Sequence, residues 1–573
     1  MIRQIVTTAS VSLLVLSLVI AAGGCQGKRA DLVLHNGNII TMDEKRPAAQ
    51  AVAIQGDLIV AVGTDTEIQP YIGQATRTIN LNGATVTPGL IDAHGHFMSI
   101  GQAKMRLELM KSKNWDEIVA MVAAAAKKAK PGEWILGRGW HQEKWDKKPR
   151  PSVEGFPTHA SLSRVSPDNP VMLTHASGHA SIVNAKCLEL SSINRGTPNP
   201  VGGDILKDAQ GNPTGLLRET AQRLAQEAFA QARSKISTEE RETERHKQAE
   251  LAAEECLSKG VTTFHDAGVS FETIDLYKKL VDEGKLGVRL WVMVSEENDS
   301  LRQRLAQYHI NNYGDRRLTV RSIKRLADGA LGARGAWLLE PYSDMPTSTG
   351  LNTTPMEKIT ETAKIALQHG FQLCVHAIGD RGNREVLNVY ESVFKDHPEK
   401  SDLRWRIEHA QHIHPDDIQR FGQLGVIASM QGIHCTSDAP YVLARLGVKR
   451  AEEGAYVWQK LMKTGAVVAN GTDAPVEDVD PIVCFYASVS RKLKDGSVFY
   501  PDQRMSRYEA LKSYTINAAY AGFEEEIKGS LAVGKLADLT VLSKDILTIP
   551  EDEIPSTEVL YTIVGGKVMY ERK

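Results

Sequence analysis

Between residues 87 and 524, short apolar runs alternate with amphipathic helical patterns, and this alternation constrains the fold more than any other feature. The apolar runs that suit buried strands lie at 87–94, 260–266, 287–294, 319–327, 371–376, 403–409, 425–430 and 465–470. Helical patterns fill most gaps between them, for example at 359–369 and 510–520. Eight strands alternating with helices are typical of a (β/α)8 barrel, so we predict an α/β protein built on a TIM barrel. A doubly wound open sheet is the alternative.

The two ends of the chain have a different pattern. Short β segments punctuated by turn sequences such as Asn36-Gly37 occupy both 30–86 and 525–573. We therefore predict one small β-sandwich domain built from both ends, flanking a barrel of residues 87–524. The first gap in the barrel pattern, 100–259, is too long for a single helix and must contain an insertion.

The first 25 residues have the pattern of an export signal. The positive residue Arg3 precedes an apolar run at 11–20, which is too short to span a membrane comfortably, and small residues then lead to Cys25. This resembles a bacterial lipobox, which implies cleavage before Cys25 and lipidation of its thiol. We expect an exported protein anchored by lipid to a bacterial membrane, on the periplasmic or cell-surface side. An ordinary secretory signal peptide is the alternative.

The composition is that of a globular protein with no excess of either charge. The chain has 573 residues, a formal net charge of -2, 42% hydrophobic residues and 24% charged residues. This balance gives no reason to expect a nucleic-acid partner. The cysteines after Cys25 are odd in number and far apart, so we predict small buried thiols and no disulfide framework. These are Cys187, Cys256, Cys374, Cys435 and Cys484.

Two histidines end the first predicted barrel strand. The stretch 87–96 reads Thr-Pro-Gly-Leu-Ile-Asp-Ala-His-Gly-His, so His94 and His96 are two residues apart. On a strand, such residues point to the same side, and the two imidazoles can face one point. Imidazole is a good ligand for zinc and similar divalent ions, so this pair is a candidate metal site.

Four later strand ends also carry polar side chains that suit a metal site. Lys324 lies in strand four, His376 ends strand five, His409 ends strand six and Asp473 follows strand eight. The carboxyl ends of barrel strands converge on one face, where catalytic residues sit. The order His-x-His, Lys, His, His, Asp over five strand ends therefore predicts one joint site rather than six separate polar residues.

With these residues the chain resembles the amidohydrolase superfamily, and within it the YtcJ-like branch (amidohydrolase family 3) that includes N-substituted formamide deformylases. The resemblance covers nearly all of the mature chain. It rests on the motifs at 88–96, 327–332, 376–380, 408–410 and 471–475, and on 177–179 and 212–215 in the insertion. It implies a distorted barrel, a β-sandwich from both chain ends, and one or two divalent metal ions, with zinc the first candidate.

The resemblance also implies a role for each strand-end residue. His94 and His96 would bind an inner metal together with Asp473, while His376 and His409 would bind an outer one. Asp473 would also be the catalytic residue that takes a proton from the attacking water and passes it to the leaving nitrogen.

Four further residues are assigned by the same resemblance. Lys324 matches the lysine that bridges two metals as a carbamate, which forms only on a neutral amine; a lysine in a salt bridge is the alternative. His179, Asp328 and Arg334 are candidate substrate-binding residues, with loop-fixing hydrogen bonds as the alternative. His434, like the neighbouring histidines at 412 and 414, is interpreted as an ordinary polar residue.

We expect a metal-dependent hydrolase that cleaves a non-peptide C–N bond, of amide or formamide type, in a small molecule. Water activated by the metal at neutral pH would attack the carbonyl carbon. An esterase or lactonase using the same site is one alternative, and a catalytically inactive ligand-binding lipoprotein is another. The sequence is compatible with one or two metals, with a homodimer, and with an anchor in the inner or the outer membrane, and it does not identify the substrate.

Overall fold

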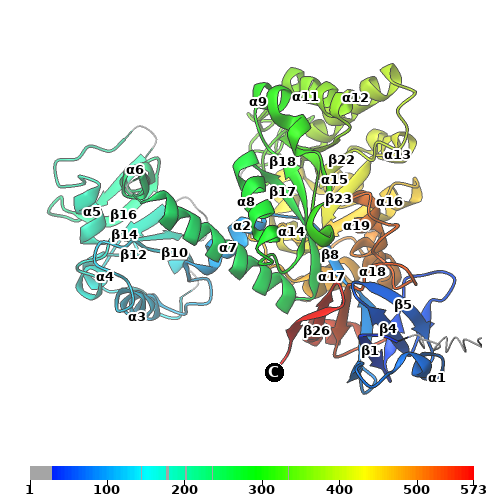
Figure 1. The fold of residues 1–573 in the computed structure, drawn as a ribbon. Coiled ribbons are helices and arrows are strands. Elements are labelled where there is room, and N and C mark those ends of the chain that lie inside the picture. The colour runs from blue at the N-terminus through cyan, green and yellow to red at the C-terminus, as the bar shows by residue number, and fades with distance from the viewer. Residues whose placement is uncertain (1–28, 143–144, 176–179, 201–202, 235, 333) are drawn as a thin grey trace, which may run out of the picture.

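The computed structural model describes residues 29–573 apart from 143–144, 176–179, 201–202, 235 and 333. Figure 1 shows a barrel, a β-sandwich beside it, and an insertion that stands apart from the barrel. Two residues predicted to be functional, Cys25 and His179, lie outside the described residues.

Eight parallel strands form a nearly closed barrel, which confirms the predicted fold class. They follow the order β24-β23-β22-β21-β20-β18-β17-β8 around the sheet. Their bounds are β8 Leu90–Gly95, β17 Val261–Val269, β18 Arg289–Val294, β20 Leu318–Leu326, β21 Gln372–Ala377, β22 Arg406–His409, β23 Ile427–Gln431 and β24 Val468–Gly471. The two edge strands meet just beyond β24, where the Asp473 N–H donates to the His94 carbonyl and the His96 N–H to the Ala474 carbonyl, each at 2.7 Å.

Each predicted apolar run corresponds to one barrel strand, with one difference in the first. The run 87–94 is divided between two sheets, because Thr85–Pro88 is strand β7 of the sandwich and β8 begins only at Leu90. Gly89 lies between them and packs so closely on the neighbouring barrel strand that a Cβ there would be 2.2 Å from Thr262 Oγ1. The chain changes sheets at the residue where a side chain has no room.

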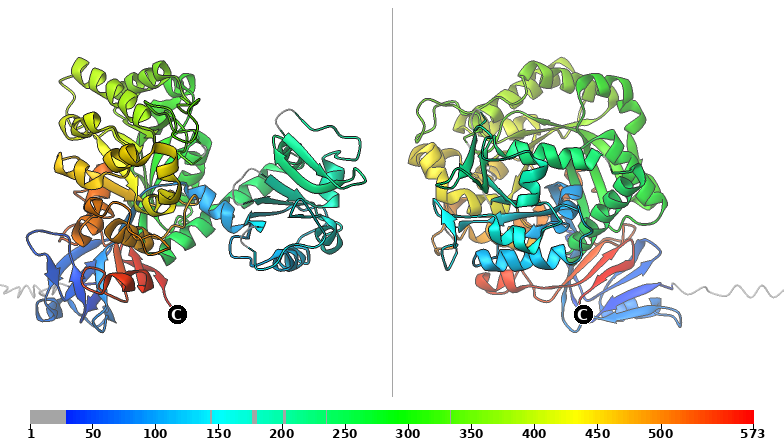
Figure 2. Two further views of the ribbon diagram at one scale, coloured as in Figure 1. Left: turned by 180° about the vertical axis from the view of Figure 1, so that it is seen from behind. Right: turned by 90° about the vertical axis from the view of Figure 1, so that its left-hand side faces the viewer.

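The helices surround the barrel sheet as a ring, which the right-hand view of Figure 2 shows. They are α2 Phe97–Lys104, α7 Thr238–Ser258, α8 Phe271–Asp282, α9 Asn298–Arg304, α11 Met356–His369, α12 Asp380–Asp396, α13 Pro415–Leu424, α14 Gly432–Leu446, α15 Val448–Gly454, α16 Trp458–Lys463, α17 Pro481–Ser490, α18 Arg507–Ser513 and α19 Ile516–Ala521. The helix predicted over 510–520 is interrupted between α18 and α19. Thr515 leaves the helical conformation, with φ -129° and ψ -95°.

Strands from both ends of the chain form the sandwich. One sheet has the order β5-β4-β1-β6 and the other β27-β26-β25-β7-β2-β3. The strands are β1 Leu32–His35, β2 Asn38–Ile40, β3 Ala48–Ala49, β4 Ala51–Gln55, β5 Leu58–Gly63, β6 Arg77–Asn80, β25 Leu539–Leu542, β26 Val559–Val564 and β27 Lys567–Glu571, together with β7. Apolar residues from both ends, such as Leu34, Val86 and Val541, share one buried core between the sheets.

The insertion between α2 and α7 has its own sheet and its own core. Its strands follow the order β15-β16-β14-β13-β10-β9, and α3 to α6 lie in the same unit. The bounds are β9 Leu107–Glu108, β10 Ile135–Trp140, β13 Val171–His175, β14 Ala180–Val183, β15 Gly203–Lys207, β16 Pro213–Glu219, α3 Trp115–Ala126, α4 Ala160–Val165, α5 Ala185–Leu190 and α6 Gln222–Ser234. Helices α2 and α7 join this unit to the barrel. They touch at Gly101, where a Cβ would be 1.7 Å from the Gln248 carbonyl oxygen.

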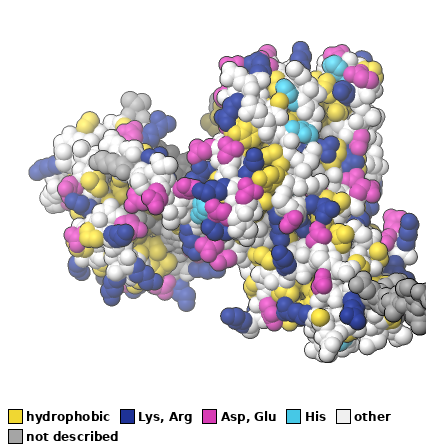
Figure 3. Space-filling model, viewed as in Figure 1, with side chains coloured by type: hydrophobic (Ala, Val, Ile, Leu, Met, Phe, Trp, Pro, Cys, Tyr) yellow, Lys and Arg dark blue, Asp and Glu magenta, His cyan; other side chains and the backbone are white. Residues whose placement is uncertain are grey.

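The surface and the cysteines are those of a globular protein. On the face drawn in Figure 3, basic and acidic side chains are interspersed. All five cysteines in the described part of the chain are free and buried, as predicted. Within that same part, no helix is both long enough and apolar enough to span a membrane.

Candidate active site

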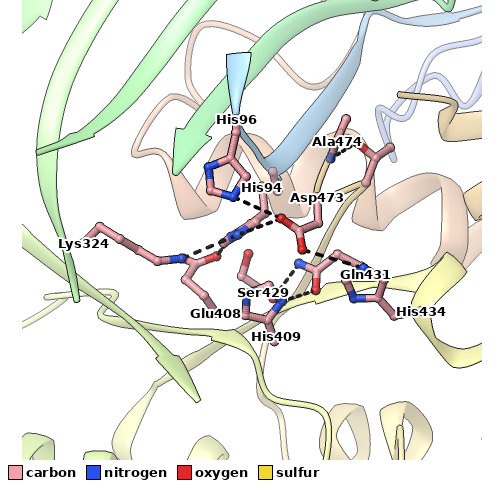
Figure 4. Close-up of polar contacts among 12 residues, drawn as sticks. His94, His96, Lys324, Glu408, His409, Ser429, Gln431, His434, Asp473 and Ala474 are labelled. Atoms are coloured by element: carbon pink, nitrogen blue, oxygen red, sulfur yellow. Dashed lines mark hydrogen bonds and ion pairs between the residues drawn. The ribbon is translucent and has the colours of Figure 1, made fainter. Parts of the chain in front are cut away.

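The predicted strand-end side chains gather at the carboxyl ends of the barrel strands. Figure 4 shows His94, His96, Lys324, His409 and Asp473 facing one another. His376, the sixth predicted residue, is on β21 and lies beside His409, with the two ring centroids 4.4 Å apart. Because all eight strands run in parallel, their carboxyl ends bring residues from 94 to 473 to one face.

His94 and His96 both turn a ring nitrogen toward Asp473. Their Nε2 atoms lie 3.7 and 3.2 Å from Asp473 Oδ1, respectively. The His94 side chain is fully buried, whereas that of His96 is 37% exposed. Burial alone would raise the pKa of Asp473, but His96, His94 and His434 outweigh it and hold the pKa below its usual range. Asp473 is therefore a carboxylate at neutral pH.

Lys324 is buried next to His94. It lies in β20 with 4% of its surface exposed, and its Nζ is 3.5 Å from His94 Nε2. Burial lowers the pKa of the Lys324 ammonium. A lowered pKa increases the fraction of neutral amine, which is the form that reacts with carbon dioxide to give a carbamate.

His376 and His409 form a second group of imidazoles beside the first. The His409 ring lies 4.6 Å from that of His94, centroid to centroid. Its Nδ1 is 2.7 Å from Gln431 Oε1, and because an amide oxygen only accepts, the proton is on Nδ1 and the lone pair on Nε2. His376 Nε2 lies 3.5 Å from Asp328 Oδ1. Burial lowers the pKa of His376 to about 3, so its ring is neutral at pH 7.

A buried ion pair lies behind His94. Glu408 and Arg406 are both 0% exposed, and Glu408 Oε1 is 2.8 Å from Arg406 Nε. Glu408 also contacts His94 Nδ1, which leaves Nε2 of that ring for a ligand. Burial alone would raise the pKa of Glu408, but Arg406 and His94 outweigh it and hold the pKa well below its usual range. The sequence motif at 408–410 pointed to Glu408 without revealing this role.

Asp92 connects β8 to the chain segment that carries Asp473. It accepts hydrogen bonds from the Thr472 hydroxyl at 2.5 Å, the Thr472 N–H at 3.0 Å and the His94 N–H at 3.2 Å. Burial raises the pKa of Asp92 to about 7. Asp92 therefore fixes the backbone on either side of the site.

His434, which the sequence analysis treated as an ordinary polar residue, lies inside the site. It is in the first turn of α14, immediately after β23, and its Nε2 is 3.7 Å from Asp473 Oδ2. Figure 4 shows it on the opposite side of Asp473 from His96. Its position four residues beyond the predicted strand 425–430, on the barrel face where the other strand-end residues meet, was the available signal.

The predicted substrate-binding residues have loop-fixing contacts. Asp328 is fully buried and accepts backbone N–H bonds from Trp337, Ile378 and Gly379 at 2.8–2.9 Å. Arg334 pairs with an acidic residue of its own loop, Asp344, at 2.8 Å. These contacts match the alternative interpretation for both residues, and a contact of either with substrate stays a prediction.

The donor atoms present fit a divalent metal ion. Two sets of three have ligand atoms within 4.8 Å of one another: His94, His96 and Asp473, and then His409, His434 and the same Asp473. Asp473 Oδ1 is buried and has no hydrogen-bond partner within the described residues. Neutral imidazoles and a carboxylate are the ligands that zinc prefers in catalytic sites.

A barrel of eight parallel strands with a histidine and carboxylate cluster at its carboxyl end defines the structural class of the protein. The model of the amidohydrolase family matches residues 77–570, and the chain belongs to that family. YtcJ of Bacillus subtilis (strain 168), an amidohydrolase by name, is 31% identical over 94% of this chain and 99% of its own. N-substituted formamide deformylase of Arthrobacter pascens is 28% identical over 95% of this chain and 98% of its own.

A solved structure shows the same architecture. An uncharacterized metal-dependent hydrolase from Pyrococcus horikoshii superposes with a TM-score of 0.72 and 26% identity, covering 91% of this chain and 99% of that one. The family match and the two relatives confirm the predicted resemblance to the YtcJ-like branch. Family and relatives together support a metal-dependent hydrolase.

Proposed function

We propose that the protein hydrolyses a non-peptide C–N bond, of amide or formamide type, in a small molecule. The observation that carries this proposal is the meeting of His94, His96, His376, His409 and Asp473 at one barrel face. The bond type is suggested by the relative named N-substituted formamide deformylase, which matches almost end to end.

The residues that would hold an inner metal are His94, His96 and Asp473, and those for an outer metal are His376 and His409. A divalent ion, with zinc the first candidate, supplies a Lewis acid that activates water and polarises a carbonyl group. For His94 and His409 the structure supports this assignment, because a carboxylate or an amide oxygen engages Nδ1 and leaves Nε2 available.

Asp473 is the proposed proton carrier of the site. Its low pKa makes it a carboxylate that can accept a proton from water and return it to the leaving nitrogen. Lys324, buried and 3.5 Å from His94 Nε2, is the proposed carbamate-forming residue that would join two metal positions.

The proposal is tested with purified protein and a panel of N-substituted formamides, simple amides, esters and lactones. Each substrate is assayed with metal-free protein, prepared by prolonged chelation, and with protein reloaded with zinc or manganese. We expect formamide or amide hydrolysis that disappears with the metal and returns on reloading. Hydrolysis of esters alone would make the protein an esterase, and full activity in verified metal-free protein would refute the metal-dependent function.

We also propose that the mature protein is exported and held at a bacterial membrane by a lipid on Cys25. The support is the sequence alone: an apolar run at 11–20 followed by small residues and then Cys25. The anchor is independent of the hydrolase proposal, because it lies outside the catalytic barrel in sequence.

A further inference from the structure

We propose that His434 is a hydrogen-bond donor that orients the Asp473 carboxylate, and that it is not a metal ligand. This inference rests on the proposed function, because it concerns the same site. It separates two roles that proximity alone leaves open, since His434 belongs to one of the two groups of residues whose atoms lie close enough to share an ion.

The position of His434 points to a function in the site. Its exposed fraction is 6%, so more than nine tenths of the residue is buried. Among the described residues, its Nε2 has no hydrogen-bond partner, although it faces Asp473 Oδ2 at 3.7 Å. A movement of less than about 1 Å would bring the pair to ordinary N–H···O distance.

The other ring nitrogen decides which proton form the ring adopts. Gln411 Nε2 lies 3.0 Å from His434 Nδ1, and because an amide NH2 group only donates, His434 Nδ1 must be the acceptor. A neutral ring with its lone pair on Nδ1 carries its proton on Nε2. The atom that faces Asp473 is therefore an N–H donor, which cannot bind a metal.

His409 shows the opposite arrangement and serves as an internal comparison. Its Nδ1 faces Gln431 Oε1, an acceptor, at 2.7 Å, so its proton is on Nδ1 and Nε2 keeps the lone pair that a metal needs. Gln411, two residues beyond β22, and Gln431, the last residue of β23, thus present opposite ends of their amides to the two histidines. One ring becomes a potential ligand and the other a donor.

The consequence for Asp473 is that its two oxygens have different neighbours. Oδ1 faces His96 at 3.2 Å and His94 at 3.7 Å, on the side of the inner metal position. Oδ2 faces the His434 donor. A donor on Oδ2 holds the carboxylate plane with Oδ1 toward the inner ligands, which makes His434 a positioning residue for the proton carrier.

The test compares His434→Leu, which removes the donor at similar volume, with His434→Gln, which retains an N–H donor. His412→Leu is the matched control, since His412 is also buried and neither of its ring nitrogens has a hydrogen-bond partner among the described residues. Metal content is measured by elemental analysis, and turnover is measured on an amide and on an ester with an activated leaving group.

We expect His434→Leu to retain all its metal and to lose about 10- to 100-fold in amide turnover, the loss typical of removing a supporting partner. The loss on the activated ester should be smaller, because that leaving group needs no proton from Asp473. His434→Gln should recover most of the amide activity, and His412→Leu should keep the wild-type ratio of amide to ester turnover.

Two results would overturn the inference: loss of a metal equivalent in His434→Leu, or an equal loss on both substrates that His434→Gln does not restore. The 15N chemical shifts of the His434 ring, assigned by difference from the His434→Gln protein, give a test that needs no turnover. A proton on Nδ1 would refute the donor role. Wild-type protein that contains metal but hydrolyses no substrate of the panel would refute the proposed function. The 15N test of the His434 ring would still decide the donor role in that case.

Discussion

Replacing Glu408 with glutamine should destabilise the protein strongly, because it leaves a buried guanidinium without its counter-charge. Glu408 and Arg406 are 0% exposed and 2.8 Å apart. At an effective dielectric constant of about 20, two unit charges at this distance attract by roughly 6 kcal/mol. Arg406 keeps its bonds to the Ala93 carbonyl at 2.6 Å and the Ser429 hydroxyl at 2.8 Å, which offset part of the loss. We therefore expect the free energy of unfolding to fall by about 3 kcal/mol, the lower end of the range for breaking a buried ion pair.

The pH dependence of this loss has a definite sign. The pKa of Glu408 in the folded protein is held well below the ordinary value of about 4.3. The stability from Glu408 is therefore fully present above that ordinary value, and it is lost as the pH falls toward the folded-state pKa. The difference in unfolding free energy between wild type and Glu408→Gln should be constant from about pH 8 to pH 5 and should shrink at lower pH.

The assay is denaturant unfolding of wild type and Glu408→Gln over this pH range, with Glu558→Gln as control. Glu558 pairs with Arg572 on the surface, where its side chain is 49% exposed, and its replacement should leave the unfolding midpoint unchanged. The same Glu408→Gln protein should bind metal about 10- to 100-fold more weakly, because a neutral amide oxygen replaces the carboxylate that accepts from His94 Nδ1 and makes Nε2 more basic. A midpoint equal to that of the control variant would refute the reasoning.

Three further substitutions test the remaining assignments. Asp473→Asn should keep at least part of its metal through the histidines but lose roughly 10²- to 10⁴-fold in turnover, and a rate within a few-fold of wild type would remove Asp473 from catalysis. Lys324→Ala should lose one of two metals and most activity, with partial rescue by short carboxylic acids; unchanged metal content and rate would make the site mononuclear. Cys25→Ala should release the protein from the detergent phase or block its processing, and a wild-type protein that never enters detergent would exclude the anchor.

The barrel and the strand-end cluster were predictable because their signals are periodic. Each barrel strand is a mostly buried run that the sequence shows as a short apolar stretch, and the parallel arrangement then brings every carboxyl end to one face. His94, Lys324 and His409 could therefore be grouped from sequence although more than 300 residues separate the first from the last. The sheet change at Gly89 was not predictable in this way, because it depends on the close approach of a neighbouring strand.

The roles of residues beyond the strand ends could not be predicted in this way. On a loop or in a first helical turn, no sequence periodicity indicates the direction in which a side chain points. Asp328 and His434 illustrate this limit. Asp328 occupies a family motif, yet its carboxylate is used by three backbone N–H groups. His434 occupies no recognised strand end, yet its ring faces Asp473. The role of such a side chain depends on which group its other polar atom contacts. For His434, the amide of Gln411 contacts Nδ1 and so determines that Nε2 carries the proton. Contacts of this kind form only in the folded barrel.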